Sequence, residues 1–306
     1  MIDVNFYTPF VQTLLPSAIY AIGNFDGVHL GHQAIFTTAR NMAKKQGLPF
    51  GVITFEPHPR LVLAPSGSRL RLTPFAQKMK MLKNYGVDHI CVVPFDQKFS
   101  QLDYQEFITK VVIGFCQAKG IVVGEDFRFG RERLGSPESF VSIEPSLPIN
   151  IIKIQNDGAG AQLSSRRILD SLSDGNINEV QECLGRPYSL AGVVVQGNQR
   201  GRTIGFPTAN LYVGEFALPK MGVYAVSALV GNSQFHGVAN IGIRPTFNQQ
   251  DVVVEVHIFD FFEDIYGHMI EVQFKAFIRP EMKFAGVNQL VAQIRADCEL
   301  AKNHLR

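Results

Sequence analysis

The chain has 306 residues, of which 46% are hydrophobic and 18% charged, a balance that excludes an intrinsically disordered protein and allows two domains. Its net charge of +2 provides no broad field that would attract nucleic acid or a membrane surface. The four cysteines are far apart and lack CxxC spacing, which excludes a disulfide framework and a cysteine zinc site. Residues 1–13 make a poor signal peptide, and no apolar stretch is long enough to span a membrane. The sequence therefore predicts a reduced, cytoplasmic protein.

The first half of the chain alternates short apolar runs with segments of helical spacing. This alternation predicts an α/β domain, in which a Rossmann-like parallel sheet carries helices on both faces. Gly47 is expected to end the first helix, Thr73 to cap the second and Asp103 to open the third. The expected strands are 18–22, 50–55, 89–93, 121–123 and 149–154, and the expected helices are 33–45, 75–84, 104–117 and 163–172.

The segment from Gly23 to His32 connects the first of these strands to the first helix, and it reads Gly-Asn-Phe-Asp-Gly-Val-His-Leu-Gly-His. Backbone N–H groups converge at a helix N-terminus, where the helix dipole favours an anion. His29 and His32 can reach phosphate oxygens there, and Gly27 and Gly31 let the backbone approach a ligand. On this loop alone, a polar loop with two incidental histidines is an equal alternative.

Two further loops follow strands that are expected to end at the same edge of the sheet. His58 follows the second strand, and Asp126 and Arg128 follow the fourth. Each would be an ordinary loop residue by itself. Because ligands of parallel sheets bind at the carboxyl ends of the strands, their convergence with His29 and His32 favours a nucleotide site.

The helix predicted over 163–172 begins with Ser164 and Ser165, either of which can cap it, and continues with Arg166 and Arg167. A capped terminus with two arginines suits a second phosphate group. The alternative is a plain amphipathic helix with solvated arginines.

The residues Phe25–His32 resemble the His-x-Gly-His signature of nucleotidyltransferases. Together with Thr54–Pro59 and Gly124–Gly130, they resemble the adenylyltransferase half of bacterial bifunctional riboflavin kinase/FAD synthetases. The resemblance implies that the FMN phosphate attacks the α-phosphorus of ATP and that pyrophosphate leaves, without a covalent enzyme intermediate. By this resemblance His29 and His32 are catalytic, and the ATP- or phosphate-binding residues are Asn24, Phe25, Asp26, Gly27, Gly31, His58, Asp126, Arg128, Ser164, Ser165 and Arg167.

The chain departs from that family pattern at three positions. The family's usual Ser-Ser-Thr-x-Ile-Arg is changed here, so that Arg166 replaces the Thr and Leu169 replaces the Arg. Ser136 stands where an acidic or amide residue is common. Arg167 is the residue that can compensate.

Beyond Tyr188 the pattern changes to strands alone, which predicts an all-β second domain, a small antiparallel barrel with a closing helix. The boundary is placed near Arg186, giving domains 1–185 and 186–306. The expected elements are a short helix 177–184, strands 190–195, 222–230, 235–241, 252–259 and 269–277, and a final helix 287–305.

The segment 197–210 is rich in glycine and arginine, and its residues Gly201, Arg202 and Gly205 suit a loop that covers phosphates. Thr208 and Asn210 offer hard oxygen ligands that can bind Mg²⁺ together with nucleotide phosphates. The alternative for these two residues is a simple turn.

Glu255 lies among β-branched residues, and from strand alternation alone it is a solvent-facing acid rather than a general base. However, 201–210, 237–247 and Glu255–His257 are similar to riboflavin kinase motifs. The resemblance implies that Glu255 activates the terminal ribityl hydroxyl of riboflavin and that Thr208 and Asn210 serve Mg²⁺ and ATP. It also places Arg279, Glu281 and Phe284 near the flavin.

The resemblance extends from Gly23 to Phe284 and implies a bifunctional enzyme that makes FMN from riboflavin and then FAD, with ATP as co-substrate. The expected partners are riboflavin, FMN and ATP, with no nucleic acid and no membrane, and weak self-association is left open. Two alternatives remain at this point. One is a riboflavin kinase with weakened or lost FAD synthesis, and the other is a non-catalytic flavin- or nucleotide-binding regulator.

Overall fold

The computed structural model describes residues 3–8, 15–63, 71–158, 160–197, 199–245 and 250–306. It divides the chain into two compact units, residues 1–165 and 166–306. Among the described residues, no helix combines the length and the hydropathy needed to cross a bilayer.

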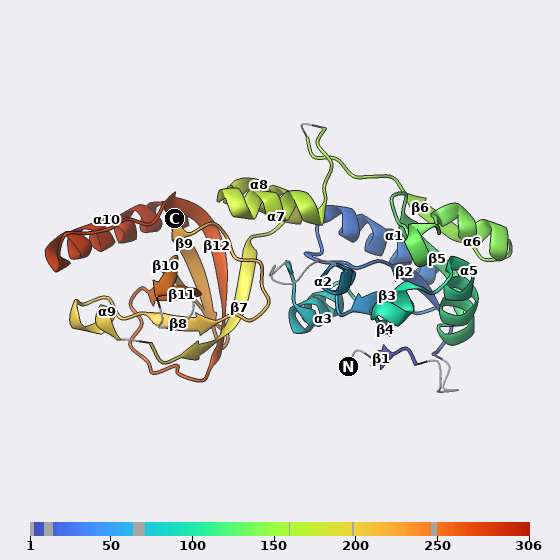
Figure 1. Cartoon of the computed structure of the whole chain (residues 1–306), viewed down its shortest axis with the longest axis horizontal. Coiled ribbons are helices and arrows are strands. Elements are labelled where there is room, and N and C mark those ends of the chain that lie inside the picture. Colours follow the sequence, from blue (N-terminus) through green and yellow to red (C-terminus); the bar gives the residue numbers. More distant parts are fainter. Residues whose placement is uncertain (1–2, 9–14, 64–70, 159, 198, 246–249) are drawn as a thin grey trace. The chain divides into compact units, whose positions relative to one another are not determined.

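The first unit is built on a six-stranded parallel sheet in the order β1-β4-β3-β2-β5-β6 (Figure 1). The chain proceeds outward from β2 through β3 to β4 and then crosses to β5, on the other side of β2. The strand order therefore reverses between β2 and β5, and ligands of such sheets bind at this reversal, outside the carboxyl ends of the strands. The elements are β1 (Asp3–Phe6), β2 (Ala18–Ile22), α1 (Leu30–Gln46), β3 (Phe50–Glu56), α2 (Pro59–Leu63), α3 (Phe75–Asn84), β4 (His89–Pro94), α4 (Gln97–Ser100), α5 (Tyr104–Glu106), the π-helix η1 (Phe107–Phe115), β5 (Ala118–Gly124), the 3₁₀-helix η2 (Arg131–Arg133), α6 (Pro137–Ile143) and β6 (Ile149–Ile152).

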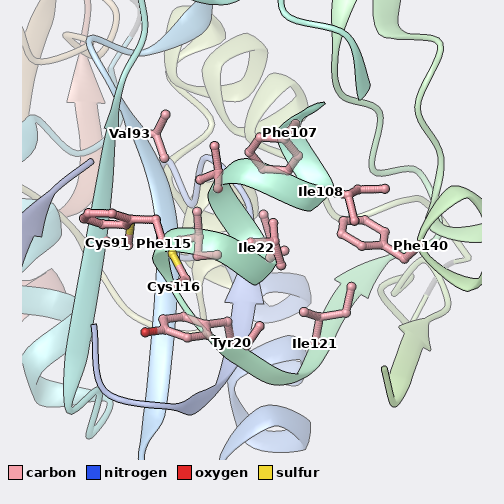
Figure 2. Packing of buried hydrophobic residues seen from close by; sticks show 14 of the residues in the cluster. Tyr20, Ile22, Cys91, Val93, Phe107, Ile108, Phe115, Cys116, Ile121 and Phe140 are labelled. Carbon is pink, nitrogen blue, oxygen red and sulfur yellow. The ribbon is translucent and has the colours of Figure 1, made fainter. Parts of the chain in front are cut away.

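Both faces of this sheet are covered by helices, as the alternating pattern predicts. Ile19 and Ala21 of β2 pack toward α1 and α3, whereas Tyr20 and Ile22 pack toward η1, the face that Figure 2 shows. Because both faces are buried, the central strands are continuous apolar runs, which is why the sequence revealed them. The segment after Asp103 differs from the single helix predicted there, since α5 passes directly into η1. Asp103 caps α5 by accepting the Gln105 N–H at 2.8 Å.

The second unit contains a closed antiparallel barrel in the order β10-β11-β8-β7-β12-β9, which confirms the predicted small barrel. One of its strands, β8, was not predicted, because 201–210 was interpreted as a ligand-binding loop and the strand forms only through pairing with β7 and β11. The elements are α7 (Ser165–Asp174), α8 (Ile177–Leu184), β7 (Tyr188–Val195), α9 (Arg200–Thr203), β8 (Ala209–Tyr212), β9 (Gly222–Val230), β10 (Ser233–Pro245), β11 (Gln250–Ile258), β12 (Met269–Arg279) and α10 (Val287–Leu305).

The closing helix α10 packs on the barrel, as predicted. Its residues Cys298 and Ala301 lie against Val223 and Ala225 of β9 and Val238 of β10. Helices α7 and α8 are grouped with the barrel, and the backbone N–H of Lys220 donates to the Leu172 carbonyl of α7 at 2.8 Å. The functional boundary near Arg186 stays a prediction.

Candidate active sites

The loop between β2 and α1 is tightly wound at the carboxyl end of β2. Phe25, Gly27 and Val28 have φ angles of 52°, 83° and 45°, in the left-handed region that strains any residue other than glycine. The Phe25 and Val28 side chains are buried in the same core cluster as the inner face of α1. Their burial offsets the strain and fixes the loop as it enters the N-terminus of α1, where His29 is the N-cap. Asn24, at the start of the loop, is exposed.

The Asp26 carboxylate anchors this loop to the segment before α3. It accepts the backbone N–H groups of Leu72 at 3.1 Å and Thr73 at 2.9 Å, and the Thr73 hydroxyl at 3.1 Å. The Gly27 N–H donates to the same hydroxyl oxygen at 2.9 Å. Burial raises the pKa of Asp26, and these hydrogen bonds oppose the rise. Thr73 therefore does not cap α3, whose N-cap is Pro74, because the buried carboxylate needs its donors. Any phosphate contact from Asp26 has to come from its backbone.

The rings of His29 and His32 lie together at the start of α1. Their centroids are 3.6 Å apart with 24° between the planes, and the Phe25 ring meets His32 edge-on at 5.2 Å. A Cβ at Gly31 would come within 3.0 Å of His29 Cε1, so the glycine makes room for this ring. Burial, and then the neighbouring His29 and Lys78, hold the pKa of His32 well below its usual value. His32 is therefore neutral near pH 7 and presents an N–H donor rather than a fixed positive charge.

His58 follows β3, which neighbours β2 in the sheet. Its Nδ1 accepts the backbone N–H of Arg60 at 3.1 Å, so the proton of the neutral ring is on Nε2. Burial, followed by the charges of Lys78, Arg71 and Arg60, lowers the pKa of His58 to about 3. His58 is thus a second neutral N–H donor at this edge of the sheet.

Three charged residues beneath the loop were not predicted as site residues. Lys78 of α3 is only 1% exposed, and its Nζ donates to the Thr54 hydroxyl at 3.1 Å. Arg71 is also buried and donates to Glu56 Oε2 at 2.5 Å. A sequence signal for Lys78 exists, because it lies on the buried stripe of α3 with Met81 and Leu82, where a charge is unusual.

The segment after β5 lies at the reversal of strand order, beside the loop after β2. The Arg128 guanidinium donates to the carbonyl oxygens of Glu125 at 3.0 Å and Phe127 at 2.8 Å, so it folds back on its own loop. Asp126 is exposed, and a Cβ at Gly124 would come within 2.9 Å of its carboxylate. Because β5 neighbours β2, Asp126 and Arg128 lie at the same edge of the sheet as His29 and His32, with both side chains at the surface.

The serines and arginines at the start of α7 separate into two groups. Ser164 directly precedes the helix, and the Ser165 hydroxyl donates to the Asp26 carbonyl at 2.8 Å, which attaches this serine to the loop after β2. Arg167 belongs to the second unit, where its Nε donates to Glu179 of α8 at 2.7 Å. Arg166 is exposed, and its Nε lies 3.8 Å from Asp170 Oδ2. The guanidinium that was expected to compensate at the phosphates is therefore engaged with an acid.

In the barrel, three polar side chains form a row across adjacent strands. Asn240 of β10 lies opposite Glu255 of β11, which lies opposite Asn210 of β8. Directly opposed residues share one face of the sheet, and the neighbours Val254 and Val256 fill the barrel interior instead. Asn210 is 8% exposed, and its buried Oδ1 has no hydrogen-bond partner among the described residues. Asn210, Glu255 and Asn240 therefore share the face of the barrel wall opposite its interior.

The loop before β8 is shaped by its glycines. A Cβ at Gly201 would come within 2.2 Å of the Phe206 carbonyl oxygen, and Gly205 has a φ angle of 87°. A Cβ at Gly197 would come within 2.3 Å of Asn210 Nδ2, so this backbone lies directly on the asparagine. Arg202 is exposed on the short helix α9, and Thr208 is half-buried. Asn198 lies outside the described residues, as do Thr246 and Phe247 of the second kinase-like motif.

The predicted flavin segment begins at the end of β12. Arg279 is bound to the buried Asp297 of α10 through Nε at 2.9 Å and Nη2 at 2.7 Å, and its Nη1 donates to the Pro280 carbonyl at 2.9 Å. The Phe284 ring lies 5.9 Å from the guanidinium, and Glu281 reaches over Gly242, where a Cβ would meet its carboxylate at 2.1 Å. Arg279 therefore holds the segment in place, and of the three predicted flavin residues only Glu281 and Phe284 are not bound to Asp297.

Two family models match the chain. The one described as FAD synthetase matches residues 11–167, and the one described as riboflavin kinase matches residues 184–305. A bifunctional riboflavin kinase/FMN adenylyltransferase of Listeria monocytogenes is 38% identical over 283 residues, which cover 91% of this chain and 90% of the relative. The chain belongs to the bifunctional riboflavin kinase/FMN adenylyltransferase family.

Other relatives of the family carry the same name. The protein of Escherichia coli K12 is 38% identical and that of Bacillus subtilis 35% identical, over 91% and 92% of this chain and 90% of each relative. A solved structure named a macrolide-efflux protein, from Streptococcus pneumoniae, is 34% identical, covers 99% of both chains and has a TM-score of 0.90. Its name describes that protein alone.

Each of the two matched regions thus contains one candidate polar site, and the sequence predicted some of the residues in each. The histidine loop was found through its spacing, and the Glu255 row only through the resemblance. Asp297, which fixes Arg279, was missed, although a carboxylate on the same stripe as Ile294, Cys298 and Ala301 is again a charge at a core position. Among the described residues there is no group of three or more His, Cys, Asp or Glu side chains that suits a metal ion.

Proposed function

We infer that this chain makes FMN from riboflavin and ATP with its barrel and FAD from FMN and ATP with its parallel-sheet unit. Membership of the bifunctional family and the presence of both matched halves support this function. The residue roles that follow are our proposals, and each rests on the geometry of its own unit.

In the kinase half, Glu255 is the proposed general base. It accepts the proton of the terminal ribityl hydroxyl while the hydroxyl oxygen attacks the γ-phosphorus of ATP, and ADP leaves. The observation that carries this role is the placement of Glu255 between Asn210 and Asn240 on one face of the barrel. The amides flank the carboxylate without adding charge. Glu281 and Phe284 are proposed to contact the flavin, and Gly201, Arg202 and Gly205 to cover the phosphates.

Asn210 and Thr208 fit a magnesium ion. The Asn210 Oδ1 is buried without a hydrogen-bond partner among the described residues, which is costly unless a ligand occupies it. Mg²⁺ prefers few protein oxygens together with phosphate oxygens and water, which is what these two neutral side chains can offer. When bound, the ion neutralises charge on the nucleotide phosphates.

In the adenylyltransferase half, the loop after β2 is proposed to bind the ATP phosphates. An FMN phosphate oxygen attacks the α-phosphorus, and the bond to the leaving pyrophosphate breaks. His29 and His32 are proposed to donate hydrogen bonds to the oxygens on which charge develops, with His58 as a further donor. The observation that carries this role is the close pair of His29 and His32 at the N-terminus of α1, beside the reversal of strand order. Asn24, Phe25, Gly27 and Gly31 would shape this cradle, and Asp126, Arg128, Ser164 and Ser165 would line it.

The expected cytoplasmic location is also our proposal. It is supported by the four cysteines, all of which are buried thiols outside any disulfide.

Purified protein incubated with riboflavin, ATP and Mg²⁺, with the flavins resolved by chromatography, tests the proposal. We expect FMN to appear first and FAD to follow. FMN alone would identify a kinase that has lost adenylylation, and unchanged riboflavin would identify a flavin- or nucleotide-binding protein without turnover. Either outcome would contradict the bifunctional assignment.

A further inference from the structure

Lys78 joins the ends of two neighbouring strands beneath the histidine loop. Its Nζ lies 3.3 Å from the Asn24 carbonyl after β2, and 3.1 Å from the Thr54 hydroxyl and 3.5 Å from the Phe55 carbonyl in β3. The Thr54 hydroxyl itself donates to the Asn24 carbonyl at 3.2 Å. The ammonium group is therefore one of the groups that set where the loop leaves the sheet.

The carboxylates that act on Lys78 are shared with other groups. The Glu56 carboxylate has its Oε2 atom 3.9 Å from Nζ, but Arg71 also binds that oxygen, at 2.5 Å. The Asp26 carboxylate accepts the donors of Leu72 and Thr73. A buried ammonium whose close partners are neutral oxygens is costly to keep, and burial lowers the pKa of Lys78 to about 8. An anion bound at the loop would add negative charge near the ammonium group and offset part of this cost.

The charge of Lys78 also acts on the groups around the loop. It contributes to the lowered pKa values of His32 and His58, and it opposes the raised pKa of Asp26. One ammonium group is thus electrostatically coupled to two of the three proposed phosphate donors, His32 and His58, and to the carboxylate that anchors the loop. In the free site the positive charge is carried by Lys78 and Arg71, and His32 and His58 remain neutral donors.

We propose that Lys78 is a positioning residue of the adenylyl-transfer site, which holds the Asn24 end of the histidine loop and stabilises the negative charge of the nucleotide phosphates bound there. This inference rests on the proposed adenylyltransferase function. It assigns Lys78 no contact with the reacting atoms, because its ammonium group donates its hydrogen bonds to Asn24, Thr54 and Phe55 beneath the loop.

The test compares Lys78→Met and Lys78→Arg in the full chain, with Lys83→Met as a matched control. Lys83 is an exposed lysine of the same helix. Conversion of FMN to FAD is measured with ATP and Mg²⁺, and kinase activity normalises the amount of active protein. Hydrogen exchange of β2 and β3 checks that the first unit is folded. We expect Lys78→Met to lower kcat/KM for adenylylation by about 10- to 100-fold, the loss typical of one charged hydrogen-bonding group, and Lys83→Met to leave it unchanged.

The pH profile separates an electrostatic role from a purely structural one. A lysine with a lowered pKa loses its proton as pH rises through that value, so wild-type kcat/KM for ATP should fall above pH about 8. The other titratable or charged groups facing Lys78 are Glu56, Arg71, Asp26, His32 and His58. The histidine pKa values are shifted downward, away from this range, and arginine stays charged. The alkaline fall should therefore be absent in Lys78→Met and displaced upward in Lys78→Arg.

Adenylylation by Lys78→Met within twofold of wild type would overturn the proposal, and so would an alkaline fall that persists in that variant. If Lys78→Met does not fold, Lys78→Arg decides, and an unchanged alkaline fall in Lys78→Arg would overturn it. A wild-type protein that makes no FAD would instead refute the proposed function itself, and this inference with it.

Discussion

The buried pair of Arg279 and Asp297 gives a prediction whose size follows from the structure. Asp297 is 2% exposed and accepts hydrogen bonds from two nitrogens of Arg279 and from Gln293 Nε2 at 2.9 Å. Asp297→Asn removes the negative charge and places an amide NH₂ group next to the N–H donors of Arg279 and Gln293. Removing one partner of a buried ion pair costs about 3–5 kcal/mol, because the remaining charge stays buried and uncompensated. Gln293 remains available as an alternative acceptor, so we expect about 3 kcal/mol for the barrel unit.

Calorimetry of the full chain measures this loss as a shift in one unfolding transition. For a unit of this size, 3 kcal/mol corresponds to a fall in Tm of roughly 10 °C. The control is Glu299→Gln on the same helix, which breaks the exposed pair with Lys302 at 2.8 Å and should change stability by less than about 1 kcal/mol. Asp297→Asn should also raise the KM for riboflavin, because Arg279 then no longer fixes the segment that carries Glu281 and Phe284. Asp297→Asn with a Tm and a riboflavin KM equal to those of the control would refute this reasoning.

Two further predictions concern pH and metal. Because the pKa of His58 in the folded protein, about 3, lies below its unfolded value near 6.5, the neutral ring contributes stability that is present above pH 6.5 and lost toward pH 3. Urea unfolding at pH 7, 6 and 5 measures the free energy of unfolding of the wild type and of His58→Asn. Per pH unit, this free energy should fall by up to about 1.4 kcal/mol less in His58→Asn than in the wild type. An equal fall in both proteins would contradict this role of His58. Asn210→Ala should raise the Mg²⁺ concentration for half-maximal kinase activity about tenfold, in line with one lost ligand, whereas Asn232→Ala in the exposed β9–β10 turn should not. An unchanged Mg²⁺ requirement in Asn210→Ala would remove Asn210 from the metal site.

Local sequence patterns were sufficient to predict the bounds of helices that have clear start and stop residues. The helix bounds predicted at 75–84, 177–184 and 287–305 agree with α3, α8 and α10. The doubly covered sheet was readable because its strands are continuous apolar runs. By contrast, β8 has only four residues and depends on its neighbours β7 and β11, so nothing local distinguishes it from a turn.

The candidate sites show the same division between local and long-range information. The spacing of His29 and His32 singled out the loop after β2 as a candidate site, but the partners of Asp26 are 46 and 47 residues away in the chain. The sequence therefore could not show that the Asp26 carboxylate is committed to the protein. Lys78 and Asp297 were missed for a related reason. Each lies on a buried helix stripe, and only the folded structure supplies the opposing groups that explain a charge there.

The most direct test of the central claim is a crossed measurement of the two activities in Glu255→Gln and His32→Ala. Each full-length variant is given riboflavin or FMN with ATP and Mg²⁺, and FMN and FAD are quantified. We predict that Glu255→Gln makes no FMN from riboflavin but converts supplied FMN to FAD at the wild-type rate. We predict that His32→Ala makes FMN normally and loses FAD synthesis by about 100-fold. Near-normal FMN formation by Glu255→Gln, or an equal loss of both activities in either folded variant, would contradict the assignment of two separate sites.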